Sequence, residues 1–173
     1  MAYTVVNLDR MSGTEDSSQL LSVKFFAEED STEVESDIEN GAVVVVGALL
    51  PNEREVRKAT VPTGAETINQ LALIANPEVV YDESVHHPLE DYINKAGEVI
   101  RAYRFHQNDN FSVTKEGFTS TPAAGDVGKY VVLGEDTTKF VLSSTTTSVT
   151  VIGVLDEIFN LGNTTYYNIT VAM

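Results

Sequence analysis

The sequence predicts a mainly β protein, a β-sandwich or a partly open barrel, with one short helix near residues 88–96. Short segments in which apolar and polar side chains alternate are typical of half-buried strands. Turn residues separate these segments at the spacing found in sandwiches and barrels. The four consecutive valines from Val43 to Val46 also favour a strand, because their branched Cβ atoms fit a pleated surface.

An alternating segment opens the predicted domain. Leu21, Val23 and Phe25 fall on one side of an extended chain, with polar residues on the other, which predicts a half-buried strand. Residues 27–39 then carry seven acidic residues and no basic one. We expect a solvated loop there, because such a run of like charges is costly to bury.

The valine run is expected to form the central strand of the sheet. Residues 42–50 are apolar on both faces, so we expect this strand to be covered on both sides. Asn40 and Gly41 predict a turn just before it. Further strand patterns follow at residues 53–61 and 71–75.

Residues 88–96 are predicted as the one helix. Pro88 suits the first helical position and Gly97 suits the position just past the end. Four apolar residues repeat at helical spacing, so we expect the helix to lay one face on the sheet. They are Leu89, Tyr92, Ile93 and Ala96.

The remainder of the chain is predicted as three strand pairs. Each pair joins two alternating segments through a polar turn, the pattern of a hairpin. Tyr166, if exposed, is a candidate anchor for an interface, because tyrosine is enriched at binding hot spots. The expected pairs are residues 99–106 with 111–114, 129–133 with 139–142, and 149–155 with 166–171.

The domain organisation is expected to be one β-rich domain, residues 20–173, preceded by an arm, residues 1–19. No core-forming pattern lies between Asn7 and Gln19, so we expect the arm to become ordered on a neighbouring subunit. The start of the chain shows no pattern of a secretory signal. No stretch approaches the roughly 20 apolar residues that cross a bilayer, so we expect no membrane partner.

The charge of the chain argues against a nucleic-acid partner. It has 26 acidic and 11 basic residues, a net charge of −15, and this field repels a phosphate backbone. A partner with a basic face would suit it. Cysteine is absent from the sequence, so neither a disulfide nor a thiolate metal site is expected.

His86 and His87 are the strongest candidates for a chemical site, since imidazole and carboxylate groups are common metal ligands. Adjacent histidines point to different sides in most backbone conformations, and His106 would have to reach them through the fold. We therefore prefer a polar loop leading into the helix, and predict no catalytic residue, metal site or cofactor. A metal-dependent enzyme is the alternative. The nearby carboxylates are Asp82, Glu83, Glu90 and Asp91.

Over residues 38–133 the chain resembles a family of small virion structural proteins from tailed bacteriophages of Gram-positive hosts, usually taken for head decoration (cement) or related auxiliary capsid proteins. The resembling segments are residues 40–47 (NGAVVVVG), 53–60 (EREVRKAT), 74–83 (IANPEVVYDE), 89–97 (LEDYINKAG), 101–104 (RAYR) and 110–114 (NFSVT).

This resemblance implies a protein that binds the major capsid protein on the exterior of the virion, after synthesis in the host cytoplasm. It brings no catalytic residues. A homo-oligomer is expected, and a trimer would suit the threefold axes of a shell. Another virion component, such as a tail-tube, head–tail joining or fibre-base protein, is the first alternative, and a cell-surface or carbohydrate-binding β module is the second.

Overall fold

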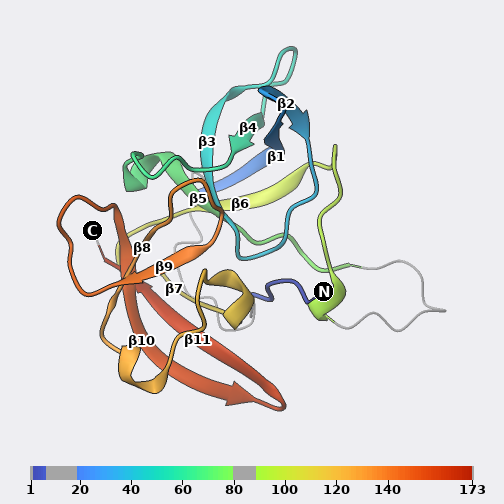
Figure 1. Cartoon of the computed structure of the whole chain (residues 1–173). Coiled ribbons are helices and arrows are strands. Elements are labelled where there is room, and N and C mark those ends of the chain that lie inside the picture. Colours follow the sequence, from blue (N-terminus) through green and yellow to red (C-terminus); the bar gives the residue numbers. More distant parts are fainter. Residues whose placement is uncertain (1, 7–18, 80–88, 173) are drawn as a thin grey trace.

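The computed structural model describes residues 2–6, 19–79 and 89–172. Within these ranges the chain is mainly β, with two sheets and only isolated 3-10 turns (Figure 1). The first sheet contains, in spatial order, β2 (Thr32–Glu35), β1 (Leu20–Glu29), β4 (Val56–Thr60), β3 (Val43–Leu49), β5 (Leu71–Ile74) and β6 (Ile100–Arg104). The second contains β7 (Asn110–Val113), β11 (Thr164–Val171), β10 (Val151–Leu161), β8 (Tyr130–Leu133) and β9 (Phe140–Ser143). The 3-10 turns are η2 (Ile68–Gln70), η3 (Leu89–Asp91), η4 (Lys115–Gly117) and η5 (Ala124–Asp126).

The first sheet curls into a partly closed barrel. Strand β1 pairs in parallel with β4 and also antiparallel with β6, so β1, β4, β3, β5 and β6 surround a common interior. Small side chains let the strands approach closely there, since Ala59, Ala72 and Ala102 are fully buried beside Val23 and Ile100. The prediction of a mainly β fold is confirmed.

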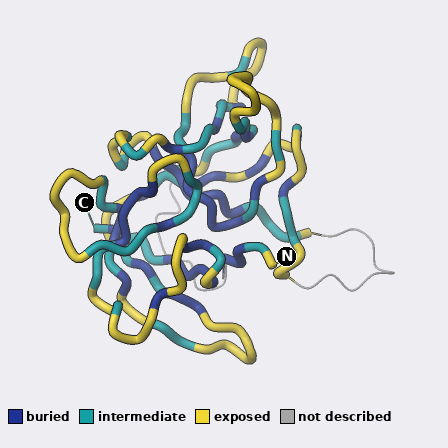
Figure 2. Tube along the Cα trace, in the orientation of Figure 1, coloured by how far each residue is buried: buried dark blue, intermediate teal, exposed yellow. Residues whose placement is uncertain are grey.

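The first half of the predicted valine strand is covered on both faces, as expected, whereas Gly47, Ala48 and Leu49 at its end are exposed. Val44 points into the barrel with Ala72 and Ile74, whereas Val43 points outward with Leu73 against the second sheet. Because successive side chains of a strand point to opposite faces, one apolar strand serves two cores. The outer core lies between the barrel and the second sheet, where Figure 2 shows buried chain.

The acidic stretch is exposed, but it forms strands where a loop was expected. The end of β1 and all of β2 make a hairpin joined by Asp30 and Ser31, whose φ angles of 49° and 62° suit a tight two-residue turn. Lys24 and Lys58 on the barrel wall form ion pairs with the carboxylates of β2. Charge patterning alone missed this hairpin because the neutralising lysines are distant in sequence.

Residues 99–106 and 111–114 do not form the expected hairpin. Strand β6 bonds to β1 and β5 in the barrel, and β7 bonds to β11 in the second sheet. The turn around Asn108, with φ of 70°, therefore carries the chain from one sheet to the other. The other two predicted pairs are confirmed as β8 with β9 and β10 with β11.

The predicted helix near residues 88–96 is reduced to the single 3-10 turn η3. Pro88 lies outside the described residues. Asn94 ends the helical path because its backbone exchanges two hydrogen bonds of 3.0 Å with Ile38, which requires an extended chain. Its side chain is buried and bonds to Asn40. A tertiary pairing therefore overrides the local helical pattern.

Candidate interaction surface

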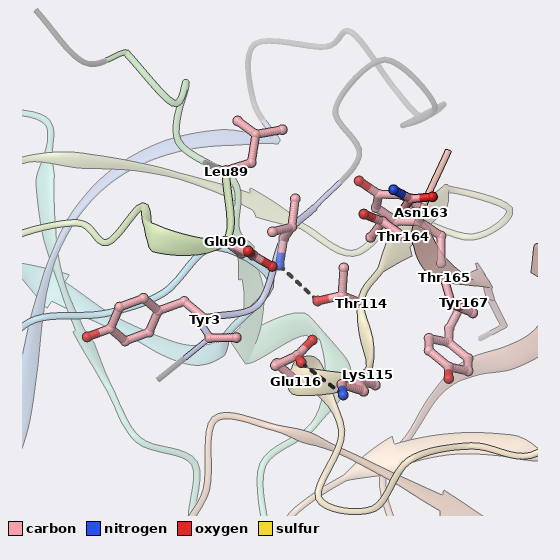
Figure 3. A pocket seen from close by; sticks show the side chains of 13 residues that line it. Tyr3, Leu89, Glu90, Thr114, Lys115, Glu116, Asn163, Thr164, Thr165 and Tyr167 are labelled. Carbon is pink, nitrogen blue, oxygen red and sulfur yellow. Dashed lines mark hydrogen bonds and ion pairs between the residues drawn. The ribbon is translucent and has the colours of Figure 1, made fainter. Parts of the chain in front are cut away.

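A groove of about 640 Å³ lies on one side of the molecule. Figure 3 shows residues 2–6 and the turn η3 on one side of it and the tip of the β10–β11 hairpin on the other. Its lining mixes apolar and polar groups, which suits an extended protein segment better than a small apolar ligand. The residues that Figure 3 labels include Tyr3, Glu90, Glu116, Thr165 and Tyr167.

Residues 2–6, which we call the 2–6 segment, form part of the groove wall. The Tyr3 N–H donates to the Glu90 carbonyl at 2.9 Å and the Thr4 N–H donates to a Glu39 carboxylate oxygen at 2.6 Å. Val5 exchanges bonds with Thr114, whose hydroxyl accepts the Val5 N–H at 3.1 Å and whose N–H donates to the Val5 carbonyl at 3.0 Å. The segment thus extends the second sheet beyond β7. The other residues of the predicted arm, 7–18, lie outside the described residues, so their ordering on a neighbour stays a prediction.

Two glycines make room for the 2–6 segment. A Cβ atom on Gly41 would lie 2.6 Å from the Thr4 methyl carbon, and the φ of Gly41 is +80°, a conformation that side chains rarely adopt. A Cβ atom on Gly117 would lie 3.1 Å from the same methyl carbon. Thr4, Val5 and Val6 are all buried as a result.

We predict that Gly117→Ala loosens the 2–6 segment, because the added methyl group crowds Thr4 and Val113. Hydrogen exchange at the Val5 and Thr114 amides should accelerate at least tenfold, the equivalent of about 1.4 kcal/mol. Thr4→Ser, which removes the crowded methyl group, should partly restore protection. Gly125→Ala, in the 3-10 turn η5 with nothing within 4 Å, is the matched control. Unchanged exchange in Gly117→Ala would contradict the assignment.

The groove is weakly charged, with a loosely held ion pair on its floor. Lys115 and Glu116 lie 3.7 Å apart, and the lysine side chain is 62% exposed. Burial raises the pKa of Tyr167, and the neighbouring Glu116 raises that pKa further. The phenol therefore stays protonated at neutral pH and can donate a hydrogen bond.

The β10–β11 hairpin projects beyond the second sheet as a two-stranded ribbon, residues 157–161 and 164–166, visible at the bottom of Figure 1. Gly162, with φ of 62°, begins the two-residue turn at its tip. Phe159 stacks on Tyr166, with ring centroids 5.7 Å apart, and Leu161 next to them is 50% exposed. The ribbon therefore carries an exposed apolar residue on a well-defined backbone.

Tyr166 itself is not the exposed anchor that the sequence suggested, because only 6% of it is accessible. The extension of the two strands toward the tip, over residues 156–161 and 164–165, was also missed, although Gly162 and Asn163 between two β-prone segments are a recognised hairpin signal. Because the tip of a hairpin is usually exposed, this signal also indicates that Leu161, which directly precedes the turn, lies at the surface.

All six lysines of the chain are in the described part, and each forms an ion pair with a carboxylate of the same chain. The 26 acidic residues outnumber all 11 basic residues of the chain, so the molecule carries a net charge of −15. The field around the molecule is therefore acidic, and it favours association with a basic surface.

A buried polar cluster fixes one end of the barrel. The Asn40 side chain donates to the Asn76 carbonyl at 2.9 Å and accepts bonds from the Asn76 N–H at 3.0 Å and the Asn94 side chain at 3.1 Å. It also donates to Glu78 at 3.2 Å, and the Tyr92 hydroxyl completes the cluster. We call these five residues the asparagine clamp. It ties three distant segments together.

The clamp makes stability depend on pH through Glu78. Burial raises the pKa of Glu78, and the hydrogen bond from Asn40 lowers it in part. A carboxyl with a raised folded-state pKa stabilises the fold fully below its unfolded pKa, and this contribution is lost as the pH rises through the folded pKa. We predict that Glu78→Gln gains stability relative to the native protein as the pH rises from the acidic range, where the Glu78 carboxyl is protonated, to neutral pH, because the amide leaves no charge to be buried. Chemical denaturation at several pH values measures the free energy of unfolding of both proteins.

Glu53→Gln is the matched control, because Glu53 is exposed. The same pH trend in the two variants would contradict the role of Glu78 in the asparagine clamp.

The metal-site candidates are only partly within the described residues. Asp82, Glu83, His86 and His87 lie outside them. Glu90, Asp91 and His106 are exposed, and in the described ranges no three such side chains gather as metal ligands. In the same ranges, no helix is long and apolar enough to cross a membrane. No family model, curated protein or solved structure matches the chain.

Proposed function

We propose that the protein is a virion structural protein of the auxiliary capsid class, which binds the outer face of major capsid subunits and reinforces the shell. The observation that carries the proposal is the β10–β11 ribbon, which extends from the two-sheet body and presents Leu161 to solvent. The resemblance over residues 38–133 supports the same class. The alternative that the sequence left open is another virion component. Co-sedimentation with heads and with tail tubes distinguishes the two roles.

Two further features suit such a role. An auxiliary capsid protein must be held by side-chain fit and charge, because it forms no covalent bond to the shell. A retained copy needs about 800 Å² of its own surface in the interface, and the groove and the ribbon lie next to each other as one candidate contact region. The acidic surface favours a basic region of the shell subunits, and such attraction also speeds their encounter.

Co-sedimentation with undecorated phage heads tests the proposal. The protein should pellet with heads and not with tail tubes, and binding should weaken as salt screens the charges. Pelleting with tail tubes alone would favour the other virion component. No pelleting with either particle at any salt concentration would contradict both.

We predict that Leu161→Asp weakens binding to heads at least tenfold, equivalent to about 1.4 kcal/mol, because it places a charge in the apolar contact. The free energy of unfolding should change by less than about 0.5 kcal/mol, since the residue is on the surface. Leu49→Asp is the matched control, because Leu49 is 44% exposed at the end of β3, far from the ribbon in Figure 1. Equal binding by the two variants would contradict a role for the ribbon.

A further inference from the structure

The site that holds the 2–6 segment has the properties of a strand-acceptor site. Each hydrogen bond between the segment and the described part of the chain reaches a residue at least 35 positions away in the sequence: Glu39 before β3, Glu90 in η3, or Thr114 just after β7. Glycines at positions 41 and 117 leave space for Thr4, and Val6 pairs with Val113 across the edge of the second sheet. None of these contacts depends on which copy of the chain supplies the segment.

An empty acceptor site would be unfavourable. Without the segment, the outer edge of β7 would present unpaired backbone groups, which promote pairing with another strand. The buried side chains of Val5 and Val6, 4% and 2% accessible, would lose their apolar contacts. The site therefore needs a strand, and the sequence it fits is that of residues 2–6 of this chain.

We infer that the acceptor site also takes the 2–6 segment of a second copy, so that neighbouring copies are joined by exchanged strands. Residues 7–19 connect the segment to β1, and thirteen residues can span up to about 45 Å when extended. Exchange keeps the same contacts, so it costs little in contact energy and is a low-cost route to an oligomer.

Charge sets the conditions under which exchange occurs. Two free copies, each with a net charge of −15, repel each other, which favours the segment in its own chain. High salt screens this repulsion, and a high local concentration of copies favours pairing between chains. Exchange therefore increases with salt, whereas binding to a basic shell surface decreases with salt. Because the two effects have opposite salt dependence, strand exchange and binding to the shell can be tested independently.

Cysteine cross-linking tests the exchange, since the native chain has no cysteine. The Thr114 N–H bonds to the Val5 carbonyl, so Val6 and Val113 form a non-hydrogen-bonded antiparallel pair. Such a pair has Cα atoms about 4.5 Å apart, which suits a disulfide. The full-length variants Val6→Cys and Val113→Cys, one with a mass tag, are refolded together and oxidised.

We expect a disulfide-linked heterodimer, whose yield rises with protein concentration and with salt. The control mixes Val6→Cys with Val44→Cys, which is equally buried but lies inside the barrel, and should give at least tenfold less heterodimer. The double variant Val6→Cys/Val113→Cys verifies that the two cysteines can form a disulfide. If the double variant forms this disulfide only within one chain, and the mixture yields no more heterodimer than the control, the inference is overturned.

Discussion

Replacing Asn40 by alanine is expected to lower the free energy of unfolding by about 3 kcal/mol or more. The Asn40 side chain is fully buried and makes four hydrogen bonds in the asparagine clamp. Its removal takes a partner from the buried Asn94 side chain and from the part-buried Asn76 N–H and carbonyl, and a polar group left unpaired in the interior costs about 1–3 kcal/mol. Urea denaturation monitored by circular dichroism measures the change.

The matched control for this change is Asn163→Ala. Asn163 is exposed on the turn of the β10–β11 hairpin, and a surface substitution there should cost less than about 0.5 kcal/mol. A loss in Asn40→Ala no larger than that of the control would mean that the clamp does not hold the end of the barrel.

Replacing Phe140 by alanine is expected to cost about 4 kcal/mol. Phe140 is 0% accessible in the outer core, and its ring lies 5.7 Å from the rings of both Phe111 and Phe118. Truncating a buried phenylalanine loses its apolar contacts and leaves a cavity, which together cost about 3–5 kcal/mol. Thermal and urea unfolding should show the loss as one cooperative transition, because this core joins the barrel to the second sheet.

Phe26→Ala provides the comparison within the same residue type. Phe26 is half-buried on the outer wall of the barrel beneath the Lys58 ammonium group, 5.5 Å from its ring centre. We expect its truncation to cost roughly 1 kcal/mol, the usual size for a partly exposed site. Similar losses in the two variants would contradict the position of Phe140 at the centre of the outer core.

Local patterns in the sequence predicted individual strands well. Alternation placed Val23 and Phe25 in the interior, and the valine run placed Val43 and Val44 in a strand covered on both faces. These features depend on side chains within a few positions of one another, where periodicity carries the information.

Pairing between distant segments could not be predicted in the same way. Whether β6 turns back onto β7 or closes the barrel against β1 depends on contacts across about 80 residues, and both arrangements satisfy the same local pattern. The helical spacing at Leu89 and Tyr92 was likewise overridden by the pairing of Asn94 with Ile38. Tertiary contacts routinely outweigh such local preferences.

The sequence predicted the acidity of the whole molecule but not the candidate interaction surface. The acidic field follows from composition, whereas the groove exists because the 2–6 segment, η3 and the hairpin tip meet in space. The glycines at positions 41 and 117 are ordinary turn residues in the sequence. Their role in seating Thr4 is a property of the folded chain alone.

The central claim, that this protein adds binding surface to a viral shell, is tested most directly by imaging the particles. Electron micrographs of virions with and without the protein should differ by density on the outside of the head, at symmetry axes or between capsomers. Restoring the protein should restore that density. Heads that are identical in the two preparations, or a difference confined to the tail, would contradict the claim.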